Sequence, residues 1–185
     1  MTPDNVFVLC TGRCGSLTFS RAARHIRNFT TGHETRSFLT GPARFAFPKR
    51  HIEVDNRLAW TLGRLQNAFG DNAHYVHLIR DRDAVAASFL ARRKYGMIKA
   101  YREAHLLNIN LRAPATPDLD VAMDMIDTIT QNIHHYLADK THVLTMRLET
   151  IDHDFATFWD WIGASGNPDA ALAEWRTRHN ATVGS

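Results

Sequence analysis

The chain has 185 residues, 44% of them hydrophobic and 22% charged, with a formal net charge of +3 and two cysteines. This balance is typical of one globular core, so we expect a single domain over residues 1–185; two cysteines cannot form a disulfide framework, and no four-ligand zinc pattern is present. No apolar run approaches the roughly 20 residues of a membrane helix, and the amino terminus lacks the features of a secretory signal, which predicts a cytoplasmic protein without a membrane span.

Short apolar runs alternate with longer amphipathic stretches along the chain. The apolar runs predict strands over residues 5–10, 29–33, 51–55, 74–79 and 142–146. The amphipathic stretches predict helices over residues 17–27, 57–69, 83–93, 99–107, 119–138, 155–162 and 170–178. Strands that alternate with helices imply crossover connections. We therefore expect a three-layer α/β fold, in which a mainly parallel sheet of about five strands is flanked by helices.

Two segments interrupt this alternation. Residues 35–50 are basic and punctuated by glycine and proline, which indicates a loop or lid. Residues 96–117 hold the helix expected over 99–107 and then a loop around Pro114 and Pro117. Asp118 is expected to cap the helix that follows.

Basic residues gather in two parts of the sequence. They are Arg13, Arg21, Arg24, Arg27, Arg36, Arg44, Lys49 and Arg50 in the first part, and Arg80, Arg82, Arg92, Arg93 and Lys94 in the second. Such local clusters favour a polyanionic ligand. No helix-turn-helix, zinc-finger or stacking-aromatic signature accompanies them, so we expect no nucleic-acid partner.

The segment 11–16, Thr-Gly-Arg-Cys-Gly-Ser, connects the first predicted strand to the first predicted helix. Gly12 and Gly15 allow the backbone to approach a ligand closely, and the free amides of the helix start attract an anion. Arg13 adds a full charge and Ser16 a hydroxyl donor. A tight turn without a ligand is the simpler alternative, but the arginine and the hydroxyl favour a cradle for a phosphate or phosphosulfate group.

The spacing of this segment differs from the nucleotide-triphosphate loop, which has four residues between its glycines and a lysine before the hydroxyl. Residues 12–16 instead resemble the 5′-phosphosulfate loop of sulfotransferases. A second motif supports the resemblance: Arg80 follows a predicted strand and Ser88 lies eight residues later, as in the family's 3′-phosphate site. The chain is thus similar to small bacterial-type sulfotransferases, which have a P-loop-like fold.

The resemblance implies that the chain uses 3′-phosphoadenosine 5′-phosphosulfate (PAPS) as co-substrate and needs no metal. The residues implied to bind it are Gly12, Arg13, Cys14, Gly15, Ser16, Leu17, Arg80, Ser88 and Arg178. Two further segments resemble the family more weakly. Arg178 lies in a late basic segment, and Glu149, in a segment after the fifth strand, is expected to brace a turn.

Transfer to a hydroxyl acceptor also requires a base that removes its proton. The second predicted strand ends at His33 and Glu34, and the resemblance implies a base directly after this strand. We favour Glu34 over His33, so the expected catalytic residues are Arg13, Glu34 and His33. Asp55 is a third possibility for the base, although a structural cap for the following helix is about equally expected.

The acceptor is expected to be a carbohydrate or another small molecule, framed by residues 35–50 and 96–117. Arg44, Lys49 and Arg50 could meet an anionic acceptor, or belong to a solvated loop. Two other functions stay open from the sequence. One is a phosphotransferase of the P-loop type with residues 52–55 holding a metal, which the missing loop lysine disfavours. The other is a relative that binds a nucleotide without turnover.

Overall fold

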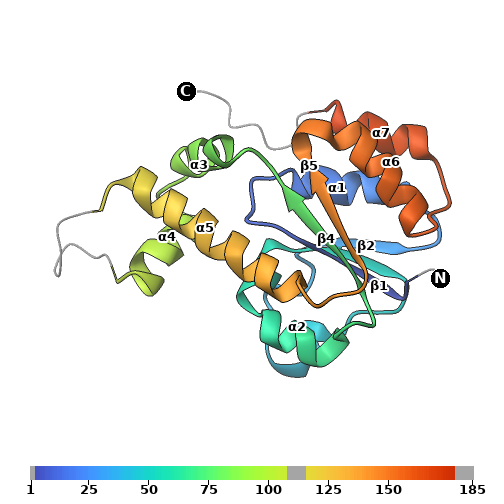
Figure 1. The fold of residues 1–185 in the computed structure, drawn as a ribbon, viewed down its shortest axis with the longest axis horizontal. Coiled ribbons are helices and arrows are strands. Elements are labelled where there is room, and N and C mark those ends of the chain that lie inside the picture. The colour runs from blue at the N-terminus through green and yellow to red at the C-terminus, as the bar shows by residue number, and fades with distance from the viewer. Residues whose placement is uncertain (1–2, 108–115, 178–185) are drawn as a thin grey trace.

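The structure, a computed structural model, describes residues 3–107 and 116–177 (Figure 1). Its five strands form one sheet in the order β2-β3-β1-β4-β5, and every neighbouring pair is parallel. The strands are β1 (Asn5–Leu9), β2 (Thr30–His33), β3 (His51–Val54), β4 (His74–Ile79) and β5 (Val143–Arg147). The predicted parallel α/β architecture is therefore confirmed.

Helices cover both faces of this sheet. They are α1 (Ser16–Ala23), α2 (Leu62–Phe69), α3 (Arg82–Leu90), α4 (Gly96–Ala100), α5 (Asp118–Leu137), α6 (Ile151–Trp161) and α7 (Pro168–Trp175). Figure 1 shows α1, α6 and α7 on one side of the sheet and α2 and α5 on the other. Within the described residues, no helix is both long and apolar enough to cross a membrane.

The core lies on both faces of the central strand β1, which is buried along its whole length. On one face Phe19 of α1 packs against Phe155 and Phe158 of α6, with ring centroids 5.6 and 5.0 Å apart. On the other face Phe7 of β1 packs against Phe69 of α2 at 4.6 Å. A strand buried on both sides is continuously apolar, which explains the uninterrupted apolar run over residues 6–9.

Several helix boundaries differ from the prediction because contacts distant in sequence set them. The predicted helix 17–27 ends at Ala23, and the chain beyond it pairs with residues 165–166 through Arg27 N and Ser165 O, 2.7 Å apart. The predicted helix 57–69 is divided into a 3₁₀ turn (Asn56–Trp60) and α2. The predicted helix 99–107 is α4 followed by a π turn (Tyr101–His105).

Two further details correct the sequence predictions. The segment 35–50 is not entirely irregular, since it contains a 3₁₀ turn (Gly41–Phe45). Asp118 does not cap α5: it is the first residue of that helix, and its carboxylate pairs with Arg93 and Arg102 instead. This carboxylate thus forms ion pairs with two arginines instead of a capping hydrogen bond with the backbone amides.

The sheet order positions the functional site. From β1 the chain builds the sheet first on the β3 side and then on the β4 side, so the two halves meet next to β1. In open parallel sheets, ligands bind outside the carboxyl ends of the strands at such a switch point. Residues 10–15, 34–35, 55–60 and 80 follow β1, β2, β3 and β4 directly and therefore share this edge of the sheet.

Candidate functional site

The segment 11–16 forms a tight loop with an unusual backbone. Gly12, Arg13 and Gly15 all have left-handed φ angles, of 86°, 61° and 89°. The loop also presses against the 3₁₀ turn that follows β3, because a Cβ atom at Gly12 would lie 2.5 Å from Asn56 Nδ2. Left-handed residues that lead into a helix start are typical of concave anion-binding loops.

The Cys14 side chain points into the protein and braces the loop. Its Sγ donates to the Gly12 carbonyl oxygen at 3.2 Å and lies 3.1 Å from Thr11 Oγ1. Both cysteines are free and buried. Cys14 can therefore offer a ligand its backbone amide, while its thiol keeps the loop in shape.

Three arginine side chains gather beside this loop. Arg13 Nε donates to Ser88 Oγ at 2.8 Å, and Arg80 Nη1 donates to the Arg13 carbonyl oxygen at 3.2 Å. Burial lowers the pKa of Arg13, and the nearby positive charges of Arg92 and Arg80 lower it further. Within residues 3–107 and 116–177, none of the three guanidinium groups has a carboxylate partner. This cluster of uncompensated positive charge suits a polyanionic ligand.

Other members of the second basic stretch do not belong to the site. Arg82 forms an ion pair with Asp127 at 2.5 Å, and Arg93 forms one with Asp118 at 3.0 Å. Both are ordinary surface pairs. Arg92 belongs to the second basic cluster of the sequence but was not among the expected binding residues; its spacing of four residues from Ser88 would place the two on one side of a helical turn.

His33 and Glu34 extend in different directions from the end of β2. His33 Nε2 lies 3.3 Å from Ser16 Oγ, at the start of α1. The Glu34 carboxylate pairs with Arg57, which follows β3. Glu34 itself has a left-handed φ of 54°. One of the two expected bases thus faces the loop, and the other faces the residues beyond β3.

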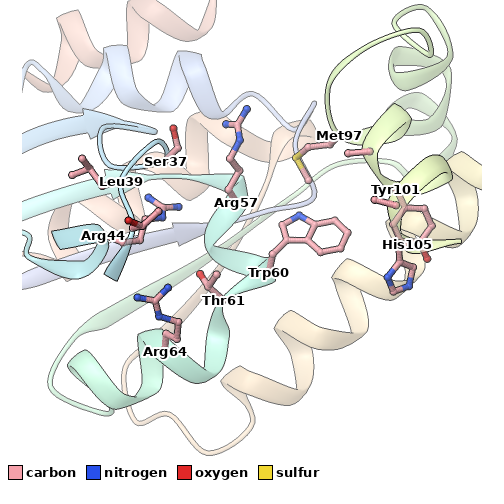
Figure 2. A pocket seen from close by; sticks show the side chains of 13 residues that line it. Ser37, Leu39, Arg44, Arg57, Trp60, Thr61, Arg64, Met97, Tyr101 and His105 are labelled. Atoms are coloured by element: carbon pink, nitrogen blue, oxygen red, sulfur yellow. The ribbon is translucent and has the colours of Figure 1, made fainter. Parts of the chain in front are cut away.

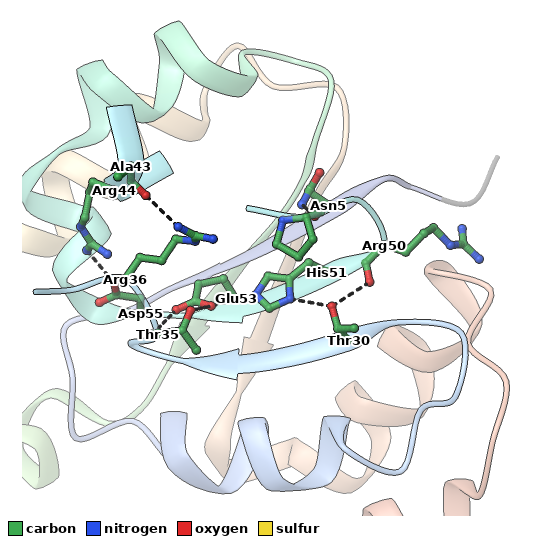
Figure 3. A network of polar contacts seen from close by, with 11 residues as sticks. Asn5, Thr30, Thr35, Arg36, Ala43, Arg44, Arg50, His51, Glu53 and Asp55 are labelled. Atoms are coloured by element: carbon green, nitrogen blue, oxygen red, sulfur yellow. Dashed lines mark hydrogen bonds and ion pairs between the residues drawn. The ribbon is translucent and has the colours of Figure 1, made fainter. Parts of the chain in front are cut away.

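A buried carboxylate, Glu53 of β3, fixes the turn that contains Glu34. Figure 3 shows its polar network: it accepts hydrogen bonds from the Thr35 amide and hydroxyl, both at 2.7 Å, and from His51 Nε2 at 2.9 Å. Although burial raises the pKa of Glu53, the hydrogen bonds of His51 and Thr35 outweigh it and hold that pKa below its ordinary value. No sequence pattern indicates this role, because Glu53 lies within a short apolar strand.

Asp55 performs the structural role that the sequence left open. Its fully buried carboxylate accepts from the Arg57 amide at 2.8 Å and from Arg44 Nη2 at 2.6 Å, and so caps the turn Asn56–Trp60 (Figure 3). Burial raises the pKa of Asp55, and the hydrogen bond of Arg44 opposes this.

The three cations considered for an anionic acceptor separate in space. Arg44 lies at the carboxyl edge of the sheet beside Asp55. Lys49 pairs with Asp4 at 3.0 Å, and Arg50 lies over the Phe29 ring at 4.6 Å. Residues 49 and 50 precede β3, and Asp4 precedes β1, so Lys49 and Arg50 lie at the opposite edge and cannot meet a ligand of this site.

A cavity of about 580 Å³ opens beside Arg57, between the segment 37–44 and the α4 region (Figure 2). Its lining residues are Ser37, Leu39, Thr40, Arg44, Arg57, Trp60, Thr61, Arg64, Met97, Ala100, Tyr101, Ala104 and His105. This volume is ordinary for a small-molecule site. The predicted framing segments 35–50 and 96–117 both contribute to it.

Three remaining details complete the site. Glu149 Oε1 accepts from the Asp81 amide at 2.8 Å, which confirms that it braces a turn. Arg178 lies outside the described residues. Among residues 3–107 and 116–177, no group of three or more histidine, cysteine or acidic residues is arranged to hold a metal ion.

Comparisons with known proteins support the fold. No protein-family model and no curated protein matches the sequence. Among solved structures, the chain is similar to the sulfotransferase domain from the curacin biosynthetic pathway, with a TM-score of 0.62 and 14% sequence identity over 98% of this chain and 81% of that chain. The chain thus shares its fold with that domain.

Proposed function

We propose that the chain is a sulfotransferase that moves a sulfuryl group from PAPS to a hydroxyl of a small-molecule or carbohydrate acceptor. One observation carries the proposal: Arg13 and Arg80 converge with Ser88 on the glycine loop, near enough to the charge of Arg92 for it to lower the pKa of Arg13, and none of the three arginines has a carboxylate partner in the described part of the chain. PAPS carries anionic groups at both its 5′ and 3′ positions, and so matches a site with several separate cations. The sulfotransferase fold supports the same conclusion.

Each group of the site has a role in this proposal. The amides of residues 15–17 and the Arg13 guanidinium bind the 5′-phosphosulfate group. Arg80 and Ser88 bind the 3′-phosphate, and Arg92 adds to the positive potential there. Because Arg13 forms hydrogen bonds with both Ser88 and Arg80, the two proposed phosphate sites are in direct contact through Arg13.

Glu34 is the base for the acceptor in this proposal, which its ion pair with the cavity residue Arg57 supports. Glu34 takes the proton of the acceptor hydroxyl while that oxygen forms a bond to sulfur. The bond between sulfur and the bridging oxygen breaks, and 3′-phosphoadenosine 5′-phosphate (PAP) leaves with the electron pair. Arg13 and the loop amides stabilise the charge that develops on this oxygen. The sulfuryl group carries less charge than a phosphoryl group, so we expect cationic side chains to suffice without a metal.

The test is transfer of radiolabelled sulfate from PAPS to a panel of hydroxyl acceptors in the presence of EDTA. We expect turnover by the wild-type chain and its loss in Arg13→Ala, whose folding is checked by circular dichroism. Arg27→Gln is the matched control, because Arg27 is exposed and precedes β2 at the opposite edge of the sheet. Unchanged kinetics in Arg13→Ala, or phosphorylation from ATP that EDTA abolishes, would contradict the proposal.

A further inference from the structure

The cavity that Arg57 lines has two chemically different walls (Figure 2). One wall is aromatic: Trp60 and Tyr101 have ring centroids 6.0 Å apart, and Tyr101 stacks on His105 at 4.7 Å. Trp60 keeps 42% of its surface exposed. An open aromatic surface inside a cavity favours a ring or hydrocarbon against it. The other wall carries three arginines.

The charges on the arginine wall do not cancel. Arg44 is paired with Asp55, and Arg57 is paired with Glu34. Arg64 has no carboxylate partner in the described part of the chain. Its Nη2 donates to the Gly41 carbonyl oxygen at 2.7 Å, and its guanidinium lies 4.8 Å from the centre of the Phe45 ring. These neutral contacts hold Arg64 in place and leave its charge available to a ligand.

Arg44 supplies a second, independent sign of a missing partner. Its side chain is 6% exposed, and its Nη1 is buried without a hydrogen-bond acceptor among the described residues. A buried guanidinium nitrogen without an acceptor is costly, and an oxygen of a bound molecule would remove that cost.

The two ends of the cavity carry different charged groups. Arg57 and Glu34 lie at the end next to the glycine loop, since the neighbouring Asn56 contacts Gly12. Figure 2 shows Arg64 at the other end of the arginine wall, with Thr61 between it and Arg57. The Arg57–Glu34 pair and the uncompensated Arg64 are therefore at opposite ends of the arginine wall.

We infer, on the basis of the proposed function, that the acceptor is an amphipathic anion. Its hydroxyl lies at Glu34, its ring or hydrocarbon body lies against the exposed Trp60 ring, and a carboxylate or similar anionic group binds Arg64. The mixed lining disfavours a large neutral carbohydrate, because Met97 extends the aromatic wall and Leu39 adds an apolar group beside Arg44 on the opposite wall.

The test compares two probes that differ only in charge, 4-hydroxyphenylacetate and 4-hydroxyphenylacetamide. Binding of each probe is measured by calorimetry or saturation-transfer NMR in the presence of PAP. We expect the carboxylate to bind about tenfold more tightly, as a charge-assisted contact predicts. Arg64→Gln should reduce the preference to about twofold or less while amide and PAP affinities stay unchanged. Arg27→Gln, with the same charge change at the opposite edge of the sheet, should keep the preference.

Equal binding of the two probes, or a preference that survives Arg64→Gln, would overturn the inference. The two proposals fail in different ways. Transfer of sulfate to both probes with equal efficiency would reject the anionic acceptor and leave the sulfotransferase in place. An Arg64-dependent preference for the carboxylate, together with no binding of PAP and no transfer, would support the anion site and reject the sulfotransferase.

Discussion

Ser88 is the residue that connects the two proposed phosphate sites, because its hydroxyl accepts from Arg13 while Arg80 bonds to the Arg13 backbone. We expect Ser88→Ala and Arg80→Ala each to abolish most of the preference for PAP over AMP, a loss of about tenfold or more for a contact to a charged group. Competition calorimetry measures it. Arg82→Ala is the control, since Arg82 pairs with Asp127 at the surface. A preference that persists in both variants would show that the 3′-phosphate binds elsewhere.

Glu34 is the residue on which the proposed proton transfer depends. Glu34→Gln keeps the size of the side chain and a polar contact to Arg57 but removes the base. Turnover should fall by about 10²- to 10⁴-fold, while PAP affinity stays within about twofold of wild type. Steady-state kinetics and calorimetry together check this. A normal rate in this variant would move the assignment to His33, which contacts Ser16.

At the residue scale, the sequence could identify side chains that follow a strand directly. Gly12, Arg13, Arg80 and His33 are of this kind, because parallel strands bring their carboxyl ends to one edge. It could not identify Glu53, whose hydrogen bonds to Thr35 depend on the pairing of β2 with β3. Arg57 and Arg64 were missed for the same reason: their partners come from other segments.

Among the elements, the glycine loop depends most strictly on the identity of one residue. Gly12 combines a φ of 86° with a Cβ position 2.5 Å from Asn56 Nδ2. Gly12→Ala should lower the free energy of unfolding by about 1–3 kcal/mol and weaken PAP binding. Gly63→Ala in α2 is the matched control, because nothing lies within 4 Å of its Cβ position and the helix favours alanine. Urea denaturation distinguishes them; equal stability of the two variants would contradict the strain.

The strands were predictable as elements, whereas several helix ends were not. Buried parallel strands are continuously apolar, and that pattern is local. Helix ends depend on which group satisfies the terminal amides and carbonyls. Asp55 caps the start of the 3₁₀ turn that precedes α2, and the chain beyond α1 pairs with residues 165–167. These partners are far away in sequence or in a different element.

For the molecule as a whole, the strand order decides which charges act together. The alternation of strands and helices predicts the fold class, but the order β2-β3-β1-β4-β5 came only from the structure. Because β2 and β3 are parallel, the basic segment 35–50 that joins them crosses from the carboxyl edge of the sheet to the opposite edge. Arg44 remains at the site, and Lys49 and Arg50 lie at the far edge. The three cations are close in sequence, but only Arg44 lies where an acceptor could meet its charge.

The stability of the whole molecule should depend on two buried histidines of β4. Burial lowers the pKa of His74 and of His77 to about 4, and the positive charges of His142 and His134 contribute. Both values lie below the ordinary 6.5, so the unfolded chain binds more protons as the pH falls from 6.5 towards 4. The contribution of the two histidines to the free energy of unfolding should be fully present above pH 6.5. The free energy of unfolding should then fall by about 2 kcal/mol per histidine between pH 7 and pH 5.

Urea denaturation at the two pH values measures this dependence. His77→Leu should remove about half of the fall, because one of the two titrating groups is gone. A free energy of unfolding that does not change between the two pH values would contradict the burial of neutral histidines in β4.

The measurement that tests the proposed function most directly is calorimetric titration of the wild-type chain with PAP, AMP and ATP, each with and without Mg²⁺. A site built from Arg13, Arg80, Arg92 and Ser88 should bind PAP at least about tenfold more tightly than AMP, with no requirement for the metal. Tighter binding of ATP in the presence of Mg²⁺, or no binding of PAP, would contradict the assignment of this site to a nucleotide with 3′ and 5′ anionic groups.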